Sequence, residues 1–163
     1  MSNARVEKGQ DMQVRQLNQD SSGIRTWAVV LDPGDELMNA LLQVADEQDI
    51  SAADFTAIGA CRRITLAWWD RDAKEYRERE IDEQVELASL VGNVAVTAEG
   101  GRKVHMHGVV ARSDLSALAG HVQRAECRPT IEVVLEEVPA YLRRVHDAST
   151  GLALLDLQPS MSD

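Results

Sequence analysis

One segment with helical spacing stands among many short strand-like runs, and this contrast limits the fold more than any other feature of the sequence. In that segment Leu37, Leu41 and Val44 recur on one helix face, and the pattern ends near Asp49. An Asp-Pro-Gly-Asp run precedes it, so Asp35 is expected to cap the helix. A single early helix followed by many strands predicts an α+β fold with a mostly antiparallel sheet, rather than βαβ winding.

The strand-like runs either alternate apolar and polar residues or are short apolar stretches between turn signals. They span residues 12–17, 24–31, 55–61, 64–69, 75–81, 85–90, 94–97, 104–111, 122–126, 130–137 and 151–157. The charged run 75–81 is expected at a sheet edge. The segment 99–102 predicts a hairpin, Gly92-Asn93 a turn or bulge, and 141–146 a short helix.

The length of 163 residues, 44% of them apolar, suits one domain with its own core. The sequence predicts that domain over residues 10–157, with flexible tails at 1–9 and 158–163. No apolar run approaches the roughly 20 residues that span a bilayer, and no secretory signal is evident. We therefore expect a cytoplasmic protein with no membrane partner.

Two cysteines, Cys61 and Cys127, lie far apart in the sequence and lack CxxC spacing. Buried free thiols are the expected state, in keeping with a reducing compartment.

The net charge of −10, from 17 basic and 27 acidic residues, limits the class of partner. Nucleic-acid affinity depends mainly on neutralising phosphates, and an acidic surface repels them. The longest basic run, Arg143-Arg144, is too short to form a phosphate-binding patch. The charge argues against DNA binding by this chain without a partner.

Three histidines carry the most specific functional signal. His105 and His107 alternate on a predicted strand, so they point to the same face, and a return strand would bring His121 to them. Three imidazoles suit Zn²⁺, Ni²⁺ or Fe²⁺, with a fourth position for water or a ligand. A solvent-facing sheet with two alternating histidines would show the same pattern, so both interpretations stay open. The fourth histidine, His146, is expected at the surface.

Two further residues near this pattern have expected roles. Met106 lies between the two histidines and faces the other way, which favours a place in the core. Glu86, on the run 85–90, is a candidate general base or extra ligand, and a solvated carboxylate is the alternative.

The order of several short motifs resembles the plants and prokaryotes conserved (PPC) domain family over roughly residues 10–157. The resemblance is carried by segments 29–37, 57–60, 85–93, 104–107, 120–121, 129–133 and 150–152. It implies a compact α+β domain that assembles as a homotrimer. In prokaryotic members the matching histidines resemble a zinc site, which would fall on His105, His107 and His121. The run Ala119-Gly120-His121-Val122 departs from the family's common Gly-Gly-His-Leu.

The resemblance leaves several functions open. Plant members carry an Arg-Gly-Arg-Pro AT-hook that reads the minor groove, and this sequence lacks it. Prokaryotic members are often labelled as DNA-binding proteins. The fold also resembles that of acetolactate decarboxylase, an enzyme with a three-histidine zinc site. We therefore expect a metal-binding regulatory or binding module. The alternative is a metal-dependent lyase or hydrolase that acts on a small anionic ligand such as an oxo-acid.

Overall fold

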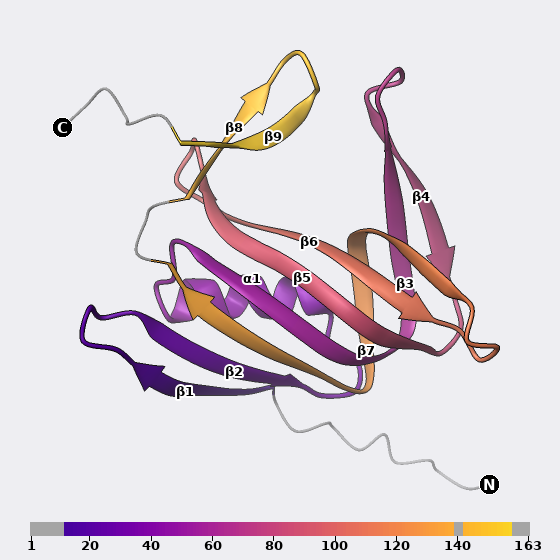
Figure 1. The fold of residues 1–163 in the computed structure, drawn as a ribbon, viewed down its shortest axis with the longest axis horizontal. Coiled ribbons are helices and arrows are strands. Elements are labelled where there is room, and N and C mark those ends of the chain that lie inside the picture. Colours follow the sequence, from indigo (N-terminus) through magenta and orange to yellow (C-terminus); the bar gives the residue numbers. More distant parts are fainter. Residues whose placement is uncertain (1–11, 139–141, 158–163) are drawn as a thin grey trace, which may run out of the picture.

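The computed structural model describes residues 12–138 and 142–157, which form one nine-stranded sheet and one helix (Figure 1). The tails expected at 1–9 and 158–163 lie outside the described residues. In chain order the elements are β1 Gln13–Gln19, β2 Arg25–Leu31, α1 Leu37–Glu47, β3 Ala53–Asp70, β4 Glu75–Ile81, β5 Val85–Thr97, β6 Arg102–Ala111, β7 Ala117–Glu137, β8 Arg143–Asp147 and β9 Leu152–Asp156.

The expected α+β class is wrong, because the fold is mostly β. The helix has only 11 residues, whereas β3 has 18 and β7 has 21. The sequence pattern predicts two separate runs in place of each of these long strands. In the structure the two runs are one strand, because shifts in the pairing register between β3 and β7 let pairing continue through the residues between them. One such shift follows Gly59, where a Cβ would come within 2.3 Å of the Thr130 carbonyl oxygen. Its φ of +149° is also a conformation that glycine adopts readily.

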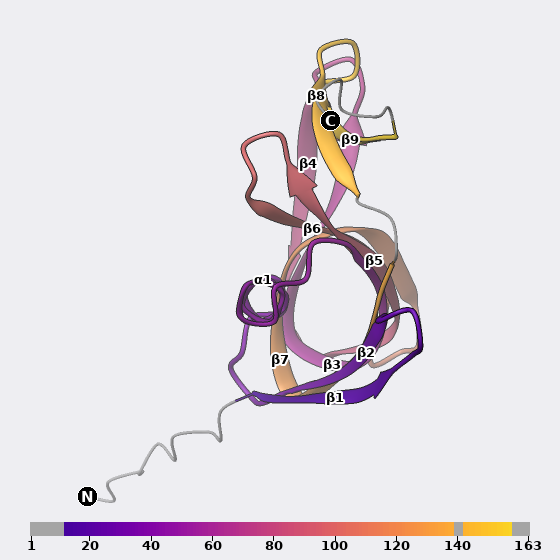
Figure 2. The ribbon, with the colours of Figure 1, turned by 90° about the vertical axis from the view of Figure 1, so that its left-hand side faces the viewer.

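The sheet closes on itself through β6, which pairs with both β5 and β7 (Figure 2). Strand β3 in turn joins β5 to β7, so these four strands complete a ring. All of these pairs are antiparallel. Among the described strands, the one parallel pair joins β5 to β8, which forms a hairpin with β9. The charged strand β4 pairs with β3 alone among the described strands, which confirms its expected edge position.

Helix α1 lies against β6 and β7 and contributes one face to the core (Figure 2). That face consists of Leu37, Ala40, Leu41, Val44 and Ala45, as its spacing predicts. The core cluster also contains Met106, which is fully buried as expected.

The helix cap differs from the prediction. Glu36, not Asp35, accepts hydrogen bonds from the backbone N–H groups of Met38 and Asn39, at 3.2 and 3.0 Å. Asp35 instead accepts a bond from the Asp32 N–H at 2.8 Å and closes the preceding turn. Both side chains therefore shape the entry to the helix, at neighbouring positions.

Two local predictions around β5 and β8 are also wrong. Gly92-Asn93 forms neither a turn nor a bulge, because β5 runs straight through it. The predicted helix at 141–146 is strand β8 instead, although residue 141 lies outside the described chain. The hairpin at 99–102 is confirmed by the bond from the Thr97 N–H to the Gly101 carbonyl at 2.7 Å.

No helix in the described part of the chain is long and apolar enough to cross a membrane.

Gly92 is needed because other atoms occupy the space of a side chain. A Cβ there would lie 2.4 Å from Phe55 Cζ and 2.6 Å from the His105 carbonyl oxygen. We expect Gly92→Ala to lower the free energy of unfolding by about 1–3 kcal/mol, the usual range for overpacking. Gly101→Ala is the matched control, since its nearest neighbour is Thr97 Oγ1 at 3.7 Å. Urea unfolding at one protein concentration measures both variants, and equal midpoints would contradict the prediction.

Both cysteines are free and buried, as expected, and they are register partners across β3 and β7. Burial raises the pKa of Cys61 to about 12 and that of Cys127 to about 11. The thiolate is the reactive form, so at pH 8 almost none is present. We expect no reaction of the native protein with a thiol-specific disulfide reagent, and two reactive thiols per chain in denaturant. Fast labelling of the native protein would contradict this.

Candidate metal centre

The three histidines predicted from spacing lie together on two neighbouring strands. His105 and His107 project from β6, and His107 is the register partner of His121 on β7. The ring centroids are 5.0 to 5.4 Å apart. One ligand nitrogen from each ring lies within 4.8 Å of those from the other two. The β6–β7 pairing is therefore what assembles the cluster.

A glycine allows β7 to approach β3 closely at this point. A Cβ on Gly120 would lie 2.9 Å from the carbonyl oxygen of Ala67, and Ala67 is the β3 partner of His121. The preceding Ala119, where the sequence departs from the family motif, is exposed and faces Val109. The departure therefore leaves the glycine that supports His121 in place.

Aromatic stacking holds the His121 ring. Tyr76, from β4, stacks on His121 with a centroid distance of 4.7 Å and an interplanar angle of 19°. The His105 ring stacks against His121 as well, at 5.0 Å and 30°. Tyr76 is itself held edge-on by Trp69 at 4.9 Å. The β3–β4 hairpin thus covers His121 with an aromatic ring.

Burial keeps two of the imidazoles neutral. It lowers the pKa of both His105 and His121 to about 4, and the nearby cations Arg144 and Lys103 act in the same direction. A neutral ring nitrogen with a free lone pair is the form that ligates a metal.

The donor set fits a divalent transition metal. Three atoms no more than 4.8 Å apart lie within about 2.8 Å of a common point, and Zn–N bonds are about 2.0–2.1 Å long, so small ring rotations suffice. The Nδ1 atom of His121 is buried and has no hydrogen-bond partner among the described residues. A buried nitrogen without a partner is costly, and an ion would supply one.

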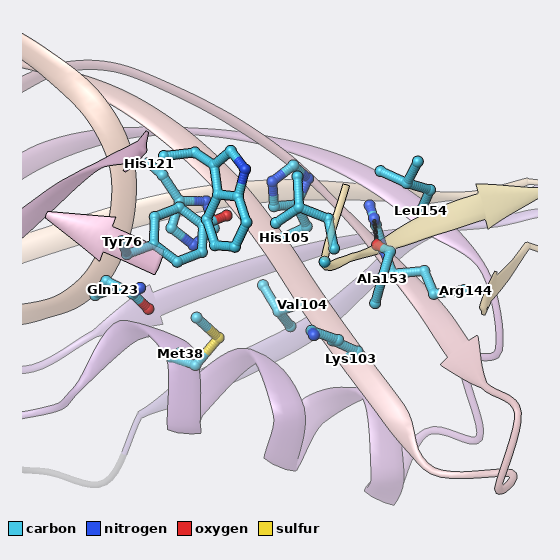
Figure 3. Close-up of a pocket in the computed structure, with 13 residues that line it drawn as sticks. Met38, Tyr76, Lys103, Val104, His105, His121, Gln123, Arg144, Ala153 and Leu154 are labelled. Carbon is cyan, nitrogen blue, oxygen red and sulfur yellow. Dashed lines mark hydrogen bonds between the residues drawn. The ribbon is translucent and has the colours of Figure 1, made fainter. Parts of the chain in front are cut away.

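A cavity of about 290 Å³ opens beside the cluster (Figure 3). We call it the histidine cavity. Two of its lining residues are His105 and His121, and two are the cations Lys103 and Arg144. The others are mainly apolar or aromatic and include Met38, Trp69, Tyr76, Val104, Leu152 and Leu154. Figure 3 shows His105 between the Tyr76–His121 pair and Arg144.

The other two predicted residues lie apart from the cluster. Glu86 is exposed on β5, paired with Ala60 and Ala111, and does not line the histidine cavity. Its role as a catalytic base stays a prediction. His146 is exposed on β8, as expected.

Sequence reasoning missed four residues that surround the cluster, namely Trp69, Tyr76, Lys103 and Arg144. Lys103 had a usable signal, because it lies two residues before His105 and so shares its face of β6. The others come from segments far away in the sequence, and only the folded sheet brings them together.

The family model of the Plants and Prokaryotes Conserved (PCC) domain, the family abbreviated PPC above, matches residues 18–139. Among solved structures, a protein of Bacteroides thetaiotaomicron provisionally described as DNA-binding is 27% identical, with a TM-score of 0.82 over 90% of this chain and 98% of its own. A metal-containing protein of Archaeoglobus fulgidus is 26% identical, with a TM-score of 0.75 over 90% and 98%.

The similarity to a decarboxylase is limited to the fold. α-Acetolactate decarboxylase of Bacillus subtilis is 13% identical, with a TM-score of 0.51 over 79% of this chain and 59% of its own. No curated protein sequence matches this chain.

Proposed function

This chain belongs to the Plants and Prokaryotes Conserved domain family, and we propose that it is a homotrimeric binding or regulatory module with a divalent metal ion, expected to be zinc, at its three histidines. The observation that carries the metal assignment is the convergence of ligand nitrogens from His105, His107 and His121 within 4.8 Å. The buried His121 Nδ1, which has no hydrogen-bond partner among the described residues, supports it. The similar Archaeoglobus fulgidus protein is described as metal-containing, which supports the assignment.

A bound ion of this kind would supply positive charge and a coordination position for a small ligand. The chain's own residues set the surroundings of that position. Tyr76 and His105 fix the His121 ring by stacking, while His107 stays exposed on the outer face of β6.

A row of exposed side chains supports the proposed self-association. Val134, Thr56, Val91 and His107 are successive register partners across β7, β3, β5 and β6, so they share one face. Val134 is 50% exposed and Val91 is 55% exposed. We call these four residues the outer row. Exposed apolar side chains in contiguous rows are typical of surfaces that another chain covers, and this row ends at a proposed metal ligand.

A metal-dependent enzyme that acts on a small oxo-acid is the second candidate. It is favoured by the combination of the histidine cavity with a ligand group of only three side chains among the described residues. A purely structural zinc site is closed by a fourth protein ligand, whereas a catalytic site keeps one position open.

The charge of −10 and the missing AT-hook lead us to propose that this chain does not bind DNA alone. The description of the Bacteroides thetaiotaomicron protein as DNA-binding belongs to that protein. Cytoplasmic localisation remains part of the proposal and is in keeping with the two free cysteines.

Elemental analysis of the purified protein tests the metal assignment. We expect close to one zinc or similar divalent ion per chain, and loss of most of it in the His105→Ala, His107→Ala double variant. His146→Ala is the control, because it removes an exposed histidine outside the cluster. If all three proteins carry the same metal content, or none, the assignment is wrong.

Sedimentation velocity at micromolar concentration tests the assembly. We expect a trimer for the unmodified chain and dissociation towards monomer for Val91→Asp, because the charge would be desolvated in the interface. Leu115→Asp is the control, since Leu115 is 84% exposed and lies outside the outer row. A monomeric unmodified chain would refute the trimer. A Val91→Asp variant that stays trimeric would show that the outer row is not the contact.

A further inference from the structure

Arg144 is a buried cation without a negatively charged partner among the residues that the structure describes. Its residue surface is only 6% exposed, although it belongs to the short hairpin strand β8. No carboxylate oxygen of the described residues lies within ion-pair distance of its guanidinium, whereas seven such pairs are formed elsewhere. Buried charges are ordinarily paired, because the removal of a charge from water is costly. The position therefore calls for a counter-charge.

The hydrogen bonds of Arg144 fix its orientation and leave one edge unused. Nη1 donates to the carbonyl of Ala153 on β9 at 2.9 Å, and Nη2 donates to Oδ1 of Asn93 on β5 at 2.8 Å. Both acceptors are neutral. Nε is buried and has no acceptor among the described residues. The guanidinium is therefore fixed by neutral acceptors, and a planar oxyanion would supply the counter-charge that these bonds do not.

The unused donor belongs to a lining residue of the histidine cavity, and the rest of the lining favours an anion. Lys103 brings a second cation to the cavity wall, and none of the described residues that line it is Asp or Glu. This is notable in a chain with ten more acidic than basic residues. Gln123 adds an amide. The wall is otherwise largely apolar, from Trp69 and Tyr76 to Leu152 and Leu154, so it suits an organic body better than a hydrated inorganic ion.

We propose that the histidine cavity binds a small organic carboxylate, whose oxygens accept hydrogen bonds from Arg144 and are attracted by Lys103, while its carbon skeleton packs against the Trp69–Tyr76 wall. In Figure 3 Arg144 lies on the side of His105 away from Tyr76, and Lys103 lies below His105, so a ligand that spans the cavity from Arg144 to Tyr76 passes His105. The carboxylate site consists of residues outside the three histidines and does not depend on the proposed metal.

Isothermal titration calorimetry with the protein as purified tests this site. The probes are three small carboxylates (benzoate, phenylacetate and pyruvate), with benzamide as a neutral analogue of the same shape as benzoate and inorganic phosphate as a second kind of anion. We expect at least one carboxylate to bind, benzoate about tenfold or more tighter than benzamide, and phosphate weakest. If none of the carboxylates binds at 10 mM, or if benzamide or phosphate binds as well as they do, the proposal is overturned.

Variants of the cationic side chains test which of them binds the carboxylate. Arg144→Met is expected to weaken carboxylate binding about tenfold or more, and Lys103→Gln about threefold. Arg143→Met is the matched control, because it removes the same charge from the next residue of β8, which does not line the cavity. An equal loss in Arg143→Met would mean a general charge effect and would overturn the proposal. If Arg144→Met fails to fold by circular dichroism, Lys103→Gln decides, because Lys103 is exposed and its substitution is expected to leave the fold intact. Unchanged affinity in that variant would refute the site.

Discussion

The pairing of β6 with β7 is the interaction on which the rest of the structure depends. It converts an open sheet into a closed ring, because β7 already joins β3 and β3 joins β5. It also sets His107 directly opposite His121. One run of backbone hydrogen bonds therefore both encloses the core and gathers the ligands. A slip of one residue in this register would turn His121 to the opposite face and separate it from the β6 pair.

The sequence predicts the part of the site that comes from one strand and its paired neighbour. His105 and His107 follow from a period of two, and His121 follows from a predicted return strand together with the family resemblance. Trp69, Tyr76 and Arg144 could not be predicted in this way, because they reach the site from β3, β4 and β8 through long-range pairing. The wrong prediction of an α+β fold class has a similar cause. The helical pattern of Leu37, Leu41 and Val44 is correct, but the sequence does not show that bulges such as the one after Gly59 fuse short runs into strands of 18 and 21 residues.

The charged side chains at the cavity wall are positive, whereas the net charge of the whole chain is negative. Most acidic groups lie on the exposed surface, where water solvates them, and several are paired with arginine, as Glu126 is with Arg62 and Arg63. Lys103 and Arg144 lie at a cavity wall to which the described part of the chain contributes no carboxylate. The acidic exterior would repel an anion at long range, and the local field at the cavity would attract it once it is close. Salt would screen the long-range part more than the short-range part.

The turn at 112–116, between β6 and β7, is closed by its own bonds, from the Arg112 N–H to the Ser116 carbonyl and from the Leu115 N–H to the Arg112 carbonyl. It contributes no ligand-type side chain to the histidine cluster. The backbone positions of the three histidines are thus set by the register of the strands and not by this turn. Evolution is free to lengthen, shorten or rewrite this turn while the three imidazoles stay in place, so relatives that differ strongly just before the second histidine motif can retain the same ligand geometry.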